Sequence, residues 1–303
     1  MTLDRRKLIA GTAASTAALL SVKQLSATEP KTSASNYMLC AFVKFIQKLP
    51  YQQLAETVAD LGFDGIEATV REGGQVLPER VQDDLPKLVE ALREHSLEIG
   101  VMASSVHHLD QPDTEKVLRT ASQLGIKRYR MKYFRYDLSR PVIQQINQIR
   151  AQVKDLVALN RELGLQGIYQ NHAGANVFGC TIWDLHQMVK DFAVKDLAIA
   201  FDIRHATVEG GLAWPVHFNL AQPHLGSVFL KDFIWEKHAS KWRIKNVPLG
   251  SGQVDPAFAQ QLRQSGFQGP VSIHVEYLHE AGIAANVAAL KRDLATARNW
   301  LTN

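Results

Sequence analysis

The sequence predicts a single (β/α)8 barrel, because eight short apolar strands alternate, in most units, with amphipathic helical segments. Several helical segments end in Gly directly before a strand, as in Leu61-Gly62-Phe63 and Leu163-Gly164-Leu165, and Gly adopts the left-handed helix cap at little cost. Eight strands alternating with helices imply parallel pairing through right-handed crossovers. Roughly 250 residues is an ordinary length for a closed barrel. The chain has 303 residues, 46% of them hydrophobic, which suffices for such a core.

The individual elements follow from the period of the apolar residues. Short apolar runs between turn residues predict strands at 37–42, 65–69, 98–104, 128–133, 167–171, 197–202, 227–231 and 271–276. Helical periodicity predicts helices at 51–61, 79–95, 113–124, 141–163, 182–192, 256–265 and 284–301. The seventh unit is irregular: residues 233–247 carry two Trp and many charges, which indicates a long loop.

Residues 1–27 are typical of an export signal. Arg5-Arg6 precedes a weakly apolar run, and Leu25-Ser26-Ala27 offers a small-residue cleavage site. The run is too short and too polar for a stable membrane span; an ordinary Sec signal or an uncleaved anchor is the alternative. Residues 28–36 are polar and predict a linker, so the barrel is expected at 37–303. We therefore expect a periplasmic or otherwise extracytoplasmic protein, exported by the twin-arginine route, with no stable membrane span after processing.

Charge and cysteine content exclude two classes of protein. The formal net charge is +4, but residues 1–27 alone carry +3, which leaves +1 for the remainder. A nearly neutral body offers no electrostatic footprint for nucleic acid.

The two cysteines, Cys40 and Cys180, both stand beside apolar residues. We expect buried thiols rather than a disulfide framework.

Polar side chains gather where the predicted strands end. Asp202 closes the sixth strand and is followed by Arg204 and His205. The carboxyl ends of barrel strands are where the chemistry of this fold is placed, although a surface loop with a salt bridge is the alternative reading. Period-two alternation brings further polar residues to the same end: Glu67, His107, Gln170, His172, Lys231, His274 and Glu276. The sequence leaves open whether Tyr169 or Gln170 faces inward, and which residues of 128–133 do.

Four segments in this order resemble the xylose isomerase-like TIM barrels, the sugar phosphate isomerase/epimerase superfamily. They are Gln170-Asn171-His172, Phe201-Asp202-Ile203-Arg204-His205-Ala206, Leu230-Lys231-Asp232 and Val275-Glu276-Tyr277. The resemblance covers most of residues 37–300. In that family Glu, Asp, His and Glu from strands five to eight commonly bind one divalent metal, which helps to shuttle a proton next to a sugar carbonyl.

Carried over residue by residue, two of the four ligands match and two are altered. Asp202 and Glu276 match, whereas Gln170 stands at the Glu position and Phe229 at the His position. An amide oxygen is an acceptable neutral ligand for Mg or Mn, but a phenyl ring cannot ligate. The resemblance thus implies Mn, Mg or Zn on Asp202, Glu276 and Gln170. The altered positions leave three alternatives: a histidine (His172, His205 or His274) replaces the missing ligand, the metal is weakly bound, or no metal binds.

Lys231 offers a route that needs no metal. An inward cation polarises a carbonyl or stabilises an oxyanion; the alternative is a structural ion pair with Asp202 or Glu276. The resemblance also implies substrate contacts for His205 and Glu67. For Arg204 a structural role is expected, such as a bidentate clamp on a carboxylate. We therefore predict Glu276, His205 and Lys231 as catalytic residues. The predicted substrate-binding residues are Glu67, His107, His172, Arg204 and His274.

The predicted function is that of a carbohydrate-active isomerase or epimerase. It moves a proton alpha to a sugar carbonyl, on a keto-sugar or keto-glycoside, and the same chemistry serves a lyase through β-elimination. The alternative is a non-catalytic sugar-binding barrel that has lost its metal site, as Gln170 and Phe229 indicate. Buried acids are a needless cost in a pure binder, which favours an enzyme. The expected partner is a small carbohydrate, and the oligomeric state stays open.

Overall fold

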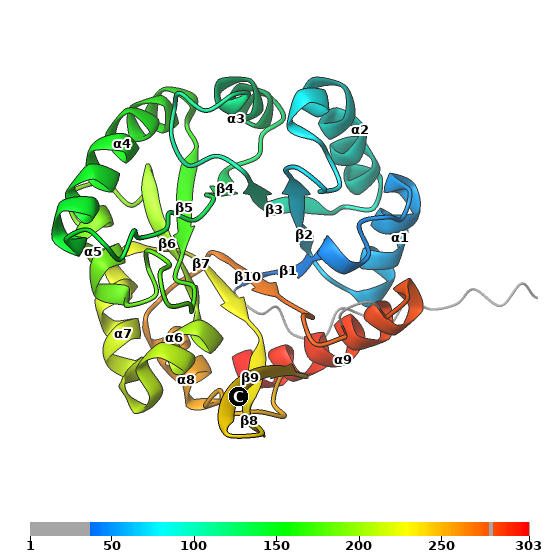
Figure 1. The fold of residues 1–303 in the computed structure, drawn as a ribbon. Coiled ribbons are helices and arrows are strands. Elements are labelled where there is room, and N and C mark those ends of the chain that lie inside the picture. The colour runs from blue at the N-terminus through cyan, green and yellow to red at the C-terminus, as the bar shows by residue number, and fades with distance from the viewer. Residues whose placement is uncertain (1–36, 279–280, 303) are drawn as a thin grey trace, which may run out of the picture. The chain divides into compact units, whose positions relative to one another are not determined.

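The strands close into an eight-stranded parallel barrel with helices around it (Figure 1). The computed structural model describes residues 37–278 and 281–302, so the predicted signal segment and linker lie outside the described residues. Around the barrel the strand order is β1-β10-β7-β6-β5-β4-β3-β2. The strands are β1 (Met38–Phe42), β2 (Gly65–Val70), β3 (Glu98–Ser104), β4 (Arg128–Arg130), β5 (Gln166–Gln170), β6 (Leu197–Asp202), β7 (Leu225–Leu230) and β10 (Pro270–Ile273). The predicted (β/α)8 TIM barrel is confirmed.

Helices connect the strands on the outside of the barrel. They are α1 (Tyr51–Leu61), α2 (Val81–Glu94), α3 (Thr114–Gln123), α4 (Val142–Leu163), α5 (Ile182–Val189), α6 (Ile203–Gly210), α7 (Trp214–Ala221), α8 (Ala257–Gln264) and α9 (Ile283–Thr302). Short 3-10 turns lie at Val43–Phe45, Pro78–Arg80, Gly211–Ala213 and Gln222–His224. Gly62 and Gly164 cap α1 and α4 with φ of 87° and 64°, as their place before a strand predicts.

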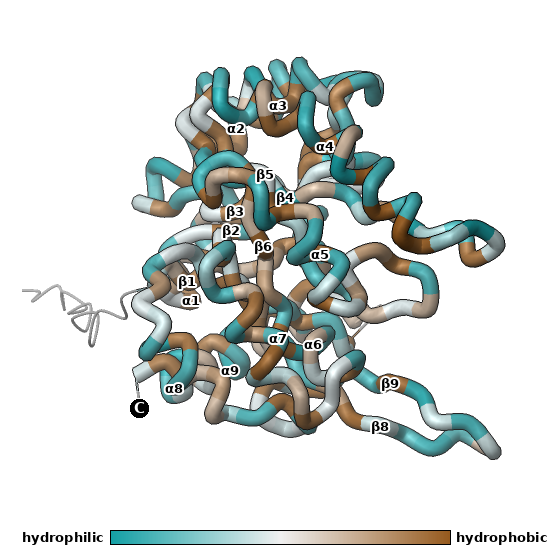
Figure 2. The backbone as a smooth tube through the Cα atoms, turned by 90° about the vertical axis from the view of Figure 1, so that its left-hand side faces the viewer, coloured by the Kyte–Doolittle hydropathy of each residue, from teal (hydrophilic) through white to brown (hydrophobic). Residues whose placement is uncertain are grey.

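The prediction of a long loop at residues 233–247 is wrong, because this part of the seventh unit forms a β-hairpin. β8 (Asp232–His238) pairs antiparallel with β9 (Lys241–Val247). Trp235 lies opposite Ile244 across the hairpin, and such aromatic and β-branched pairs stabilise a ribbon. Figure 2 shows the hairpin extending away from the body of the barrel. The dense charges reflect this exposure rather than a lack of regular structure.

Two predicted strands end early, which moves two polar residues into loops at the barrel mouth. β4 ends at Arg130 and β10 at Ile273. Tyr133 and Glu276 therefore follow their strands instead of closing them. Loop residues at this end of the barrel are free to turn toward a common centre, which sequence alternation cannot show.

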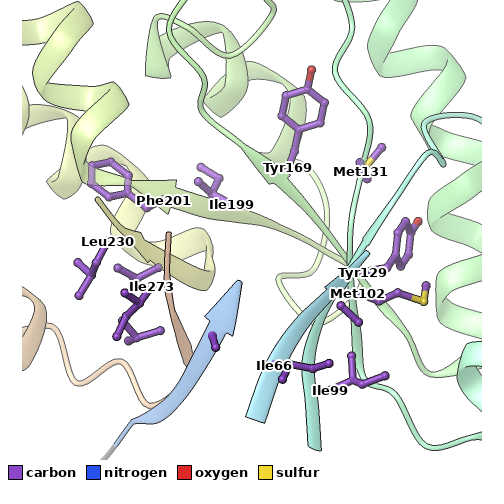
Figure 3. Close-up of a cluster of buried hydrophobic side chains, with 14 of the residues drawn as sticks. Ile66, Ile99, Met102, Tyr129, Met131, Tyr169, Ile199, Phe201, Leu230 and Ile273 are labelled. Atoms are coloured by element: carbon purple, nitrogen blue, oxygen red, sulfur yellow. The ribbon is translucent and has the colours of Figure 1, made fainter. Parts of the chain in front are cut away.

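The core has an outer layer between strands and helices and a smaller layer inside the barrel. Figure 3 shows outer side chains from neighbouring strands, among them Ile199 and Phe201 of β6 and Tyr169 of β5. The inner layer consists of Val101, Ile168, Ala198, Ala200 and Phe229. Because Tyr169 belongs to the outer layer, its neighbour Gln170 faces inward.

Both cysteines are free thiols. Cys40 is buried and Cys180 is half-buried. Within residues 37–278 and 281–302, no helix has the length and apolar character needed to cross a bilayer.

Candidate functional site

A group of charged and polar side chains fills the carboxyl end of the barrel, and we call it the strand-end cluster. Each side chain comes from a barrel strand or from the residues directly after one. Its members are Glu67, Arg130, Gln170, Asp202, Lys231, His274 and Glu276. All are buried except Glu276, whose side chain keeps 25% exposure. The structure thus brings together six of the residues that the sequence predicts as a site.

Lys231 lies between the two carboxylates of the cluster. Its Nζ is 3.1 Å from Asp202 Oδ2 and 3.2 Å from Glu276 Oε2. Burial by itself lowers the pKa of Lys231, but Asp202 and Glu276 outweigh burial and raise it. Burial likewise raises the pKa of Glu276, yet Lys231 and then His274 hold it well below its usual range. Lys231 and Glu276 are therefore both charged near neutral pH.

Glu67 forms a second charged centre beside the first. Ser272 Oγ donates to Glu67 Oε2 at 2.7 Å, His274 Nε2 lies 2.8 Å from the same oxygen, and Arg130 Nε lies 2.9 Å from Oε1. The β2–β3 register shifts between Ile66 and Glu67, an irregularity of the kind that re-aims side chains near functional sites.

His274 links the two centres. Its Nδ1 lies 3.7 Å from Glu276 Oε1, an ion-pair distance rather than a hydrogen bond. Burial lowers the pKa of His274, but Glu67 and Glu276 outweigh burial and raise it. The imidazole therefore favours its charged form between two carboxylates.

Gln170 closes the cluster into a ring. Its Oε1 accepts from Arg130 Nη1 at 2.6 Å and from the Tyr133 hydroxyl. Its Nε2 donates to Asp202 Oδ2 at 2.7 Å. The amide oxygen is thus engaged by Arg130 and Tyr133, and the amide nitrogen faces the carboxylate.

His205 presents a neutral hydrogen-bond donor to this site. It stands in the first turn of α6, where Asp202 Oδ1 accepts from its backbone N–H at 3.1 Å and caps the helix. The ring atom Nδ1 accepts from Ala173 N at 3.1 Å and lies 2.9 Å from Arg204 Nη1. Two donors on Nδ1 leave the proton on Nε2. Burial, then Lys231, lowers the pKa of His205 well below its usual value.

The Nε2–H of His205 lacks a hydrogen-bond partner in the described part of the chain. The atom is buried and lies 3.7 Å from Asp202 Oδ2, beyond hydrogen-bond range. A buried donor without a partner is costly in a folded protein. It is therefore suited to a substrate oxygen.

His172 has the opposite tautomer. Its Nδ1 lies 2.9 Å from the carbonyl oxygen of Ala173, and only a protonated Nδ1 bonds a carbonyl, so Nε2 carries a lone pair. The ring packs at a tilt against that of His205, with centroids 3.9 Å apart, and against that of Tyr133 at 4.7 Å. Burial, then Lys231, lowers the pKa of His172 to about 4. Two adjacent rings thus offer a proton acceptor, His172 Nε2, and a proton donor, His205 Nε2–H.

Two predicted residues have other neighbours. Arg204 donates to Asn246 Oδ1 at 2.7 Å and lies over the Phe233 ring at 5.4 Å, so it anchors the base of the hairpin; the carboxylate clamp expected for it does not appear among its contacts in the described residues. His107 contacts Ser105, Gln111, His108 and Phe134. The structure gives His107 no contact with the strand-end cluster within the described ranges, and its substrate role stays a prediction.

Sequence reasoning missed Arg130 and Tyr133. Alternation along residues 128–133 left both faces open, whereas the structure turns Tyr129 outward, where its hydroxyl donates to Asn160 of α4 at 2.9 Å. Arg130 therefore points inward. Glu67 was the clue present in the sequence, because a carboxylate buried inside a barrel requires a buried cation from another strand.

The chain belongs to the xylose isomerase-like TIM barrel family, which it matches over residues 55–301. A search of curated proteins found no match. Among solved structures, 3-keto-D-glucoside 4-epimerase from E. coli is 17% identical, with a TM-score of 0.65 and coverage of 87% of this chain and 99% of that one.

Two further structures have the same fold. A xylose isomerase domain protein from Planctomyces limnophilus is 17% identical, with a TM-score of 0.60 and coverage of 82% and 90%. A xylose isomerase-like TIM barrel protein from Mycobacterium smegmatis, in complex with magnesium, is 15% identical, with a TM-score of 0.62 and coverage of 89% and 100%. At these identities the likeness concerns the fold.

The four ligand positions implied by the family do not fit a divalent ion here. Phe229 packs in the inner apolar layer with its ring 4.7 Å from that of His274. The Gln170 oxygen is engaged by Arg130 and Tyr133, and Lys231 Nζ separates Asp202 from Glu276. Across the described residues, no three His, Cys, Asp or Glu side chains are grouped to hold a metal.

Proposed function

We propose that this protein is a carbohydrate-active isomerase or epimerase that moves a proton on the carbon next to a sugar carbonyl. The substrate is a keto-sugar or keto-glycoside, and elimination from the same intermediate makes it a lyase. Family membership and the fold shared with a keto-glucoside epimerase support this class. The observation that carries the proposal is that two N–H donors lie close to the same oxygen, Asp202 Oδ2: Lys231 Nζ at 3.1 Å and His205 Nε2 at 3.7 Å.

These two donors supply what enolisation needs at the oxygen. The substrate carbonyl accepts hydrogen bonds from the Lys231 ammonium and from the Nε2–H of His205. When the neighbouring C–H bond breaks, its electron pair moves to that oxygen and creates an oxyanion. Buried, pre-positioned donors stabilise such a charge more strongly than water does.

Two groups are placed to accept the proton that leaves the carbon, and one of them acts as the base. His172 Nε2 and the carboxylate of Glu276 are both unprotonated near neutral pH, because each has a lowered pKa. Return of the proton to the opposite face of the same carbon gives an epimer. Return to the former carbonyl carbon, with the hydroxyl proton passing from one oxygen to the other, gives an isomer. Loss of a leaving group from the intermediate gives the elimination product.

The test is proton exchange in D2O. The protein is incubated with a 3-keto-glucoside or a panel of ketohexoses, and NMR follows deuterium at the carbon next to the carbonyl. We expect exchange by the wild type, lowered about 10²–10⁴-fold by His172→Gln or Glu276→Gln for whichever group is the base. Lys231→Met and His205→Gln each lower it about 10²–10³-fold through loss of oxyanion stabilisation.

His238→Gln is the matched control, because His238 is an exposed histidine of the hairpin. Exchange in that variant should equal that of the wild type. Sugar binding detected by saturation-transfer NMR without any exchange would instead favour the non-catalytic sugar-binding barrel.

A further inference from the structure

The space that a divalent ion needs between Asp202 and Glu276 holds a cation of the chain itself. Lys231 Nζ lies 3.1 Å from one carboxylate and 3.2 Å from the other. The lysine is 3% exposed, and it extends from the residue directly after β7, whose pairing with β6 and β10 fixes its position. An ion bound by both carboxylates would have to displace this ammonium group.

The other two ligand positions, Phe229 and Gln170, have no free atom that could bind a metal ion. Phe229 is fully buried, with its ring 4.7 Å from that of His274 and 5.5 Å from the Arg130 guanidinium. Gln170 uses its oxygen for Arg130 and turns its amide nitrogen to Asp202 at 2.7 Å. With these two ligands missing, an ion would depend on Asp202 and Glu276, the two carboxylates that Lys231 already contacts.

Electrostatics also disfavour a second cation. Each carboxylate of the cluster already has a cationic partner, since Glu67 pairs with Arg130 at 2.9 Å and Lys231 is shared by the other two. A divalent ion beside an ammonium group in a buried site would meet like-charge repulsion that water does not screen.

We propose that the Lys231 ammonium is the cation of this site in place of a divalent metal ion, and that it takes a carbonyl oxygen of the sugar. An ammonium group has three N–H donors. Among the described residues, Asp202 and Glu276 use two, which leaves one for the substrate. The identity of that substrate rests on the proposed function, whereas the replacement of the metal does not.

Metal binding is measured directly on the full-length chain. After treatment with EDTA, Mn²⁺ is titrated by calorimetry, and free Mn²⁺ is followed by electron paramagnetic resonance. We expect the wild type to bind no Mn²⁺ up to about 1 mM. Lys231→Met removes the ammonium and leaves two unpaired carboxylates, so its affinity for Mn²⁺ should be at least about tenfold higher than that of the wild type.

Lys245→Met is the matched control. Lys245 pairs with Glu236 at 2.9 Å on the exposed hairpin, so its loss also removes a lysine from a carboxylate. That variant should bind no more Mn²⁺ than the wild type. An equal gain in both variants would mean that Mn²⁺ responds to overall charge, and it would overturn the proposal.

Two further results would overturn it. One is stoichiometric, micromolar Mn²⁺ binding by the wild type that Asp202→Asn abolishes. The other is micromolar Mn²⁺ binding by Gln170→Glu/Phe229→His, a double variant that keeps Lys231 and so tests the proposal even if Lys231→Met does not fold. Such binding would show that the missing ligands, and not the ammonium group, exclude the metal. Continued absence of binding in that double variant supports the proposal.

The two proposals fail in different ways. No deuterium exchange together with no Mn²⁺ binding would sink the isomerase function and leave the replacement of the metal intact. Exchange that EDTA abolishes and Mn²⁺ restores would keep the function and overturn the role of Lys231. Exchange that is insensitive to EDTA supports both.

Discussion

Glu67 illustrates how single residues make a charged barrel interior stable. It is fully buried, and Arg130, Ser272 and His274 surround it at 2.7–2.9 Å. Burial alone raises the pKa of Glu67, but Arg130 and His274 outweigh burial and lower it from 4.5 to about 2. The folded state therefore holds the ionised form more strongly than the unfolded chain does.

The pH dependence of stability follows from this lowered pKa. The contribution of ionised Glu67 is fully present above pH 4.5 and is lost as the pH falls toward about 2; it is on the order of 3 kcal/mol. Glu67→Gln should therefore lower the free energy of unfolding at pH 7, and its difference from wild type should shrink on acidification. Urea unfolding at a series of pH values measures this. A difference that stays constant from pH 7 to 3 would contradict the assignment; Glu236→Gln, in an exposed ion pair, is the control.

At the scale of elements, Asp232 holds the hairpin and the following loop together. Its Oδ1 accepts backbone N–H bonds from Phe233 at 2.8 Å and Val254 at 3.0 Å, and its Oδ2 accepts from Gly250 at 3.1 Å and Gly252 at 2.8 Å. The Gly250-Ser251-Gly252 segment is thus a turn gathered around one carboxylate. A Cβ at Gly252 would lie 2.3 Å from Asp232 Oδ1, which explains why Gly stands there.

Asp232→Ala should destabilise the fold by about 2–5 kcal/mol, because four N–H groups lose a charged acceptor. Since Asp232 directly follows Lys231, deuterium exchange should fall as well. Thermal unfolding and the exchange assay measure the two effects. Asp255→Ala is the control: its carboxylate is exposed and accepts from Ala257 N at 2.9 Å, and it should cost only about 1 kcal/mol. Equal losses in both variants would show that Asp232 has no special role.

At the scale of the whole molecule, the strand-end cluster exists only because the barrel closes. Ser272 and Glu67 are 205 positions apart in the sequence, yet they are hydrogen-bonded at 2.7 Å. β1 lies between their strands and pairs with both. Opening of the barrel at this seam would separate Glu67 from Ser272 and His274, so the charged interior and the closure of the sheet depend on each other.

We propose that the chain is exported by the twin-arginine route, because Arg5-Arg6 precedes a weakly apolar run. Arg5→Lys/Arg6→Lys should keep the protein in the cytoplasm, whereas Lys7→Arg, which conserves charge beside the pair, should leave export unchanged. Cell fractionation with immunodetection measures both. Equal export of all three proteins would exclude the twin-arginine route.

The sequence by itself determined the features that depend on short-range order. Alternating strand and helix periods, with Gly62 and Gly164 as helix caps, predicted the barrel, and the shared strand polarity placed Asp202, Lys231 and Glu276 at one end. The strands, the helices and their order follow from the local period of apolar residues, which depends only on residues close together in the sequence. The irregular composition of residues 233–247 hid a hairpin, because cross-strand pairs such as Trp235 and Ile244 carry no helix or single-strand period.

Only the tertiary structure decided which groups meet and in what chemical state. It turned Arg130 inward toward Glu67, set Lys231 between two carboxylates, and gave His172 and His205 opposite tautomers through their separate contacts with Ala173. The physical reason is range: partners distant in sequence become neighbours only when the barrel closes. The charge and hydrogen bonding of a buried group depend on those neighbours.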